Sequence, residues 1–151
     1  MWLKTKSLRS FKGGYLTATE SITFLTIPAG TVLKSGDDRV QAMLVARIQG
    51  ERVPNDPARY RRSSEIVLSD SAPHSSILEV YCLDFEKANP RPNQQFDIVA
   101  SDPSAGHLVS RGLQNGLTAR VIQSALWIGR ANPSEADLRG RFQVSEPAPV
   151  W

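Results

Sequence analysis

The stretch SILEVYCLD, residues 76–84, holds the pattern that decides the fold of this chain. Side chains of a strand alternate between two faces, so Leu78, Val80 and Cys82 would share one face of a strand here. The opposite face would carry Ile77, Glu79, Tyr81 and Leu83. We predict a strand over this stretch, and it is the last strand that we predict before the pattern becomes helical.

The sequence before residue 76 is typical of strands and turns. Residues 21–27, SITFLTI, are rich in β-branched side chains and are followed by the turn residues 28–30. Residues 39–49, RVQAMLVARIQ, predict a second strand that forms a hairpin with the first. Its alternating apolar residues are Val40, Ala42, Leu44, Ala46 and Ile48. We expect a surface loop over residues 50–64, because they contain two prolines in a polar cluster, and a short strand over residues 65–68.

After residue 84 the pattern changes from strands to helices. Residues 87–95, KANPRPNQQ, form a connection that two prolines interrupt. Asp102 followed by Pro103 is typical of a helix N-terminus and predicts a helix over residues 104–113. Because strands precede helices, the order indicates an α+β domain rather than alternating βαβ units.

A second helix is predicted over residues 117–131, LTARVIQSALWIGRA. Its apolar side chains form one stripe of Leu117, Val121, Ala125 and Ile128, with Ile122, Leu126 and Gly129 beside it. These residues cover most of the circumference, so we expect a buried helix. Ser134 and Asp137 resemble a capping box and predict a short last helix that reaches Phe142.

The length and composition are those of one globular domain. A chain of 151 residues can bury its own core, so we expect a single domain over residues 1–151, with loosely ordered ends at 1–20 and 144–151. A net charge of +3 over this length is low for a nucleic-acid-binding protein. No apolar run approaches the roughly 20 residues of a membrane-spanning helix. The sequence therefore predicts no nucleic-acid partner and no membrane insertion, and we expect a monomer.

The cysteine and the two histidines limit the chemistry. A single cysteine excludes an internal disulfide, and His74 and His107 lack a suitably spaced carboxylate partner, so we predict no metal and no cofactor. The basic start of the chain is not followed by the apolar run of a signal peptide. We expect a cytoplasmic location if the chain is complete, and an extracellular or cell-surface location if it belongs to a longer exported protein.

Gln123 is an amide in the most apolar helix of the chain. A buried amide without partners costs about 1–3 kcal/mol, so this side chain would find a hydrogen-bond partner, face water or react. A thiolate of Cys82 could attack its carboxamide carbon, expel ammonia and leave a thioester, provided that folding supplies near-attack geometry and oxyanion donors. Trp127, one turn beyond Gln123, and Tyr81, beside Cys82, could shield the product from water.

Two short motifs, YCLD at residues 81–84 and QSALW at residues 123–127, resemble the internal thioester domains of surface adhesins of Gram-positive bacteria. In that family an aromatic-cysteine-aliphatic motif on a strand supplies the thiol, and a Gln-x-Ala-aliphatic-Trp motif on a helix supplies the acyl group. The resemblance covers residues 77–142 and implies that Cys82 is the thiol and Gln123 the acyl donor. It also implies that Ala125, Leu126 and Trp127 fill the packing positions of the second motif.

The resemblance implies a fold and a function together. The fold would have a β-rich, sandwich or barrel-like body in the N-terminal half and a C-terminal helical subdomain, which meet at the bond. An amine, typically a lysine of a host protein, would attack the thioester and stay covalently attached, without turnover. Around the bond we predict binding roles for Tyr81, Asp84 and Trp127.

Two alternatives remain open. In the first, the domain has a structural or non-covalent binding role, Cys82 is a core residue and Gln123 bonds a neighbouring carbonyl group. In the second, Cys82 is the nucleophile of a hydrolase and His74 or His107 is its base.

Overall fold

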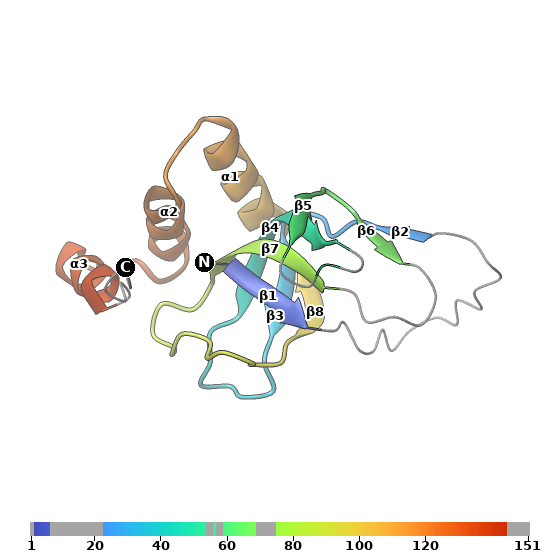
Figure 1. Cartoon of the computed structure of the whole chain (residues 1–151). Coiled ribbons are helices and arrows are strands. Elements are labelled where there is room, and N and C mark those ends of the chain that lie inside the picture. The colour runs from blue at the N-terminus through green and yellow to red at the C-terminus, as the bar shows by residue number, and fades with distance from the viewer. Residues whose placement is uncertain (1, 7–22, 54–55, 57–58, 69–74, 145–151) are drawn as a thin grey trace.

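The computed structural model of the chain (Figure 1) describes residues 2–6, 23–53, 56, 59–68 and 75–144. One antiparallel sheet contains β1 (Trp2–Lys6), β3 (Thr31–Lys34), β4 (Met43–Arg52), β5 (Tyr60–Arg62), β7 (Ser75–Cys82) and β8 (Asp97–Ser101). Its strand order is β1-β7-β4-β3-β8, and β5 pairs with β4 outside this path. A separate two-stranded ribbon contains β2 (Thr23–Leu25) and β6 (Ile66–Leu68). The helices α1 (Pro103–Gln114), α2 (Ala119–Ala131) and α3 (Glu135–Val144) follow, and the predicted α+β class is confirmed.

The core lies on both faces of the sheet. We call one part the Cys82 cluster, which contains Ile27, Leu33, Met43, Val45, Ile48, Ile66, Leu78, Val80, Cys82 and Trp127, with Phe85, Phe96, Leu138 and Phe142 partly buried against it. We call the other part the Tyr81 cluster, which contains Leu44, Ala46, Tyr81, Leu83, Ala105, Val109, Ile122 and Leu126. The predicted alternation is confirmed, because Leu78, Val80 and Cys82 lie in the Cys82 cluster, whereas Tyr81 and Leu83 lie in the Tyr81 cluster.

β4 departs from strict alternation. Leu44 and Ala46 lie in the Tyr81 cluster as the pattern predicts, but Ile48 lies in the Cys82 cluster. The register of β4 against β7 shifts between Val45 and Arg47. An extra residue in one strand turns the following side chains to the opposite face. The bulge therefore moves Ile48 across the sheet.

The predicted pairing of the first hairpin is wrong. β2, which lies within the predicted strand at residues 21–27, pairs with β6, and the hairpin partner of β4 is β3. β3 was not predicted, and neither was β8, which pairs with the other edge of β3. Strands of three to five residues hold too few alternations to separate them from loops by pattern alone.

Two other segments also differ from expectation. The expected loop at residues 50–64 contains the end of β4 and all of β5, which pair from Gly50↔Arg62 to Arg52↔Tyr60. Residues 2–6, within the segment expected to be loosely ordered, form β1 and pair with β7 from Trp2↔Glu79 to Lys6↔Ser75. Residues 7–22 and 145–151 lie outside the described residues.

The helix termini follow the predicted capping residues. The Asp102 side chain accepts a hydrogen bond from the Ala105 N–H (3.0 Å) at the start of α1. At the start of α3, the Asp137 N–H donates to Ser134 Oγ (3.2 Å) and the Ser134 N–H donates to Asp137 Oδ2 (3.3 Å). Among the described residues, no helix combines the length and apolarity that crossing a membrane requires.

α2 is less buried than predicted. Its buried residues are Ile122, Leu126 and Trp127. Three members of the predicted apolar stripe are about half exposed: Leu117 (47%), Val121 (49%) and Ile128 (48%). The helix lies with one side against the end of the sheet (Figure 1), so apolar residues on its other side face water. When apolar residues surround nearly the whole helix, the sequence does not show which side of the helix packs against the sheet.

Candidate functional site

The side chain of Gln123 meets the backbone of Cys82. The Cys82 N–H donates to Gln123 Oε1 at 2.8 Å, and Gln123 Nε2 donates to the Cys82 carbonyl oxygen, also at 2.8 Å. Oε1 and Nε2 are both attached to the carboxamide carbon, so this carbon lies beside the Cys82 backbone. The sulfur of Cys82 is two bonds from its own Cα. The structure thus brings the predicted acyl group to the backbone of the residue that carries the predicted thiol, across 41 residues of sequence.

The geometry of the sheet explains why Gln123 binds at this position. Leu83, the next residue, donates its N–H to Ala42 on the β4 side, so the N–H and C=O of Cys82 point to the opposite edge of β7. Among the described residues, the pairing of β1 with β7 reaches only as far as Glu79. The Gln123 carboxamide therefore takes the place of a neighbouring strand at the end of β7, and it satisfies a donor and an acceptor that would otherwise be unpaired.

The Cys82 side chain lies in an apolar environment. It is 6% exposed, and its sulfur lies 4.0 Å from the sulfur of Met43. Burial raises the pKa of the thiol to about 11, because the interior disfavours the thiolate. The negative charge of Asp84 raises the pKa further, whereas the positive charge of Arg141 lowers it. At neutral pH the thiol therefore keeps its proton.

Trp127 covers the Cys82 cluster from α2. Its ring is 4% exposed and lies edge-on to Phe85, with ring centres 5.2 Å apart. On its other side the ring of Phe142 lies 5.6 Å away. The indole Nε1 is buried without a hydrogen-bond partner in the described part of the chain. Trp127 therefore shares a core cluster with Cys82, and its role as a shield of the bond stays a prediction.

Tyr81 and Asp84 have other surroundings than the predicted shield and binding roles suggest. Tyr81 packs in the Tyr81 cluster on the opposite face from the Cys82 side chain, because the two are neighbours on a strand. It therefore does not cover the sulfur. Asp84 Oδ2 accepts the Ala42 N–H at 2.9 Å and lies 3.8 Å from Lys87 Nζ, which fixes the start of the loop after β7.

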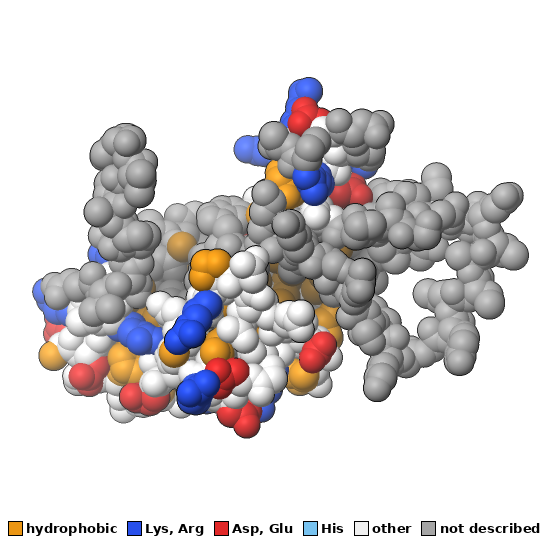
Figure 2. Space-filling model, turned by 60° about the horizontal axis from the view of Figure 1, so that its bottom comes forward, with side chains coloured by type: hydrophobic (Ala, Val, Ile, Leu, Met, Phe, Trp, Pro, Cys, Tyr) orange, Lys and Arg blue, Asp and Glu red, His pale blue; other side chains and the backbone are white. Residues whose placement is uncertain are grey.

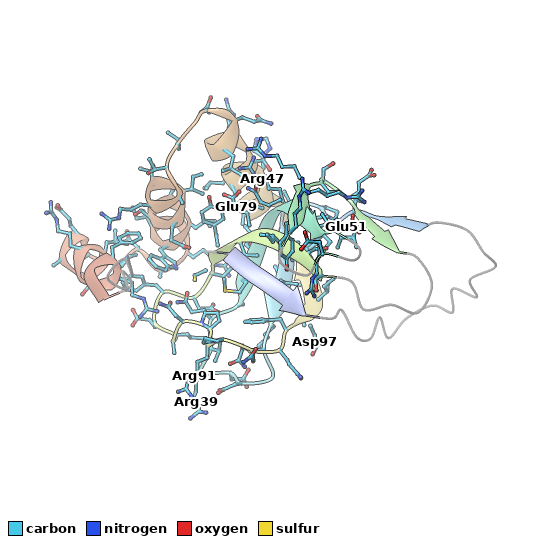
Figure 3. All side chains as sticks on the ribbon, in the orientation of Figure 1. Arg39, Arg47, Glu51, Glu79, Arg91 and Asp97 are labelled. Atoms are coloured by element: carbon cyan, nitrogen blue, oxygen red, sulfur yellow. The ribbon has the colours of Figure 1, made fainter. Side chains whose placement is uncertain are left out.

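A buried polar network is centred on Glu79, on the face of β7 opposite to the Cys82 side chain. The sequence pattern did not predict it. Glu79 is 8% exposed and accepts hydrogen bonds from Arg47 (2.7 Å), Gln49 (2.6 Å) and Tyr81 (2.9 Å). Burial by itself raises the pKa of the Glu79 carboxyl, but these three hydrogen bonds outweigh it and lower the pKa overall. Figure 3 shows Arg47 and Glu79 side by side near the base of α1. The sequence does contain opposite charges on the two strands, Arg47 on β4 and Glu79 on β7. That they pair can be seen only once the register of the strands is known.

The alternative hydrolase needs a histidine base near Cys82. His107 is exposed on α1. It lines a surface pocket with Ser110, Arg111, Gln114 and Asn115, and Cys82 does not line this pocket. His74 lies outside the described residues. Within the described ranges, no group of three histidine, cysteine or carboxylate side chains could hold a metal ion.

Charge is mixed on the part of the described surface that Figure 2 shows. On the face shown in Figure 2, basic and acidic side chains of the described residues are interspersed with apolar ones. The net charge of +3 is thus not concentrated on this face.

The fold and the site define the chain as an α+β domain in which a helix side chain is hydrogen-bonded to a strand end beside a buried thiol. In comparisons with known proteins, no family model matches the sequence, and neither a curated protein nor a solved structure matches it.

Proposed function

We propose that this domain is a covalent binding module in which Cys82 and Gln123 form an internal thioester. The observation that supports the proposal most directly is the pair of 2.8 Å hydrogen bonds between the Gln123 carboxamide and the Cys82 backbone. A thioester needs its two partners to be held in near-attack geometry, because an amide is a poor electrophile. Resemblance of residues 81–84 and 123–127 to the thioester domains of Gram-positive surface adhesins points in the same direction.

The first chemical step would form the thioester. The Cys82 sulfur attacks the Gln123 carboxamide carbon, the bond from that carbon to Nε2 breaks, and the thiol proton leaves with Nε2 as part of ammonia. The Cys82 N–H already donates to Oε1, so the negative charge that develops on this oxygen has a donor in place. Because burial keeps the thiol protonated at neutral pH, the proton that the leaving nitrogen needs is supplied by the nucleophile itself.

The second step would capture a partner. An amine nitrogen attacks the thioester carbon, the bond from carbon to sulfur breaks, and a proton from the amine passes to the sulfur. The products are an amide between the partner and Gln123, and a free Cys82 thiol. We propose a lysine side chain of another protein as the amine, and a cell-surface location if the domain belongs to a longer exported protein. The module reacts once and is not an enzyme.

Intact mass spectrometry of the native protein tests this proposal. We expect a mass lower than the sequence mass by one ammonia, and addition of methylamine should replace this deficit with an adduct. Cys82→Ala and Gln123→Ala should both have the full mass and form no adduct. A wild-type protein of full sequence mass, with one thiol that titrates after unfolding, would contradict the proposal.

The second candidate is a non-covalent interaction or structural domain. One specific observation favours it: the Gln123 carboxamide is already satisfied by the Cys82 carbonyl and N–H, as a structural glutamine would be. In that case the mass measurement gives the full sequence mass, and Cys82 remains an unreacted thiol in the core.

A further inference from the structure

The Cys82 half of the candidate site is covered, whereas Gln123 is partly buried. Cys82 is 6% exposed and Trp127 is 4% exposed, so a reagent has no open path to the sulfur from this side. An element that covers Cys82 must therefore move before a reagent can reach the sulfur. β7 carries Cys82 and α2 carries Gln123, so moving either of them would separate the two groups. The covering element must be a different one.

α3 covers the Cys82 cluster with few side chains. Leu138 and Phe142 are partly buried against that cluster. The ring of Phe142 lies 5.6 Å from that of Trp127, and the Arg120 guanidinium carbon lies 4.9 Å from the Phe142 ring centre. Most other described side chains of α3 are exposed. Figure 1 shows α3 at the outer end of the row of helices, beyond α2 as seen from the sheet.

Arg141 ties α3 to the loop that follows β7. Its guanidinium donates to the Lys87 carbonyl oxygen and, at 3.4 Å, to Asn89 Oδ1. Asn89 Oδ1 also accepts a hydrogen bond from Gln41 at 2.8 Å, so the receiving loop is itself held in place. Burial raises the pKa of the Cys82 thiol, and the charge of Arg141 acts against that rise.

The connection between α2 and α3 suits a hinge. Asn132 ends α2 in the left-handed conformation, with φ of 45°, and only Pro133 and Ser134 separate it from α3. Ser134 and Asp137 cap the first turn of α3 with hydrogen bonds inside that element. α3, together with its capping residue Ser134, can therefore turn about residues 132–133 without losing its N-terminal cap.

We propose that α3 is a lid over the Cys82–Gln123 pair, held closed by Phe142 on Trp127 and by Arg141 on the 87–89 loop. Small nucleophiles and alkylating reagents reach the pair only when α3 lifts. As a control on amine capture this inference rests on the proposed thioester, but as a statement about access to Cys82 it applies to the free thiol as well.

Three variants of α3 test the lid. Arg141→Gln removes the charged contact with the loop, and Phe142→Ala removes the ring from Trp127. Arg139→Gln is the matched control, because its described ion pair is with Glu135 of the same helix (2.6 Å). If the wild-type protein has the ammonia deficit, the measurement is the rate of methylamine adduct formation. We expect this rate to rise about tenfold in Arg141→Gln and Phe142→Ala, as the loss of a charged hydrogen bond or an aromatic contact predicts, and to stay unchanged in Arg139→Gln.

If the wild-type protein lacks the deficit, the measurement is the rate at which iodoacetamide alkylates Cys82 in the native state, with the same order expected. Loss of the Arg141 charge alone would slow alkylation by disfavouring the thiolate, so a faster rate reports opening. Thermal unfolding checks the fold of each variant, and Arg141→Gln decides the test if Phe142→Ala does not fold. Equal rates in the wild type and Arg141→Gln would overturn the lid, whereas a missing deficit overturns only the thioester.

Discussion

At the residue scale, the Gln123 carboxamide both accepts and donates a hydrogen bond at the end of β7, which an ionised carboxylate cannot do. We predict that Gln123→Glu lowers the free energy of unfolding by about 1–3 kcal/mol at pH 8, because the Cys82 carbonyl loses its donor and faces a negative charge. The folded state then favours the protonated carboxyl and raises its pKa. The lost stability should therefore return as the pH falls.

Denaturant unfolding at pH 5 and pH 8 measures this effect when Gln123 and Gln123→Glu are compared in a Cys82→Ala background, in which no thioester can form. The exposed Gln114→Glu is the control and should change stability by no more than about 0.5 kcal/mol at either pH. If Gln123→Glu loses the same unfolding free energy at both pH values, the proton on the carboxyl group does not replace the amide donor.

Cys82 gives a second pH dependence at the residue scale. Burial raises the pKa of its thiol from the ordinary 9.0 to about 11. The unfolded chain loses this proton first, so the stability that the neutral thiol contributes is complete below pH 9 and is lost as the pH rises to 11. Two pKa units correspond to about 3 kcal/mol.

Chemical unfolding between pH 8 and pH 11 measures this loss. Protein with a free thiol should lose up to about 3 kcal/mol more than Cys82→Ala over this range. A molecule with an intact thioester has no thiol to titrate and should follow Cys82→Ala instead. A larger alkaline loss in Cys82→Ala than in the free thiol form would contradict this origin of the effect.

At the scale of elements, α1 is seated by a close backbone contact. A Cβ atom added at Gly106 would lie 2.6 Å from the Ala29 carbonyl oxygen and 2.7 Å from Gly30 Cα, and both are backbone atoms that cannot rotate away. Gly129 on α2 has no atom within 4 Å of the same added position. We predict that Gly106→Ala destabilises the protein by about 1–3 kcal/mol, whereas Gly129→Ala stabilises it by about 0.5–1 kcal/mol.

Thermal unfolding of the two variants checks this pair of opposite signs. The helix propensity gained is the same in both, so the difference between them isolates the contact with the turn at residues 28–30. Equal shifts of the two melting temperatures would mean that α1 can move away from that turn without cost.

Elements with strong local signals could be predicted, and those that depend on distant partners could not. The strand at residues 76–84 and the N-caps Asp102 and Ser134 follow from side-chain alternation and capping chemistry, which are local. The pairing of β2 with β6 depends on residues some 40 positions away. The bulge after Val45 leaves no mark in an apolar pattern, although it sends Ile48 to the other face.

The candidate site shows the same division. An amide in an apolar helix predicts that Gln123 has a partner, and the motifs at residues 81–84 and 123–127 suggest which one. The alternation predicted for residues 76–84 already puts Cys82 and Tyr81 on opposite faces, so the expectation that Tyr81 shields the sulfur rests only on nearness in sequence. The partners of Glu79 could not be predicted, since they follow from the register of β4 against β7.

At the scale of the whole molecule, the two groups of the candidate site come from different parts of the fold. β4 and β7 supply six of the ten buried residues of the Cys82 cluster and three of the eight of the Tyr81 cluster, whereas Gln123 lies on α2. The sheet therefore provides the fixed surface, and the helices add the covering and the second reactive group.

The position of Gln123 has a consequence for contacts between molecules. An unpaired strand end offers its N–H and C=O groups to any extended chain nearby, and such edges start aggregation. At Cys82 these groups are already occupied by a side chain from α2, which cannot propagate a ladder as another strand would. The Gln123 side chain thus blocks the backbone groups at the end of β7, where the described part of β1 no longer pairs with it. A strand from a second copy cannot pair with β7 at this position.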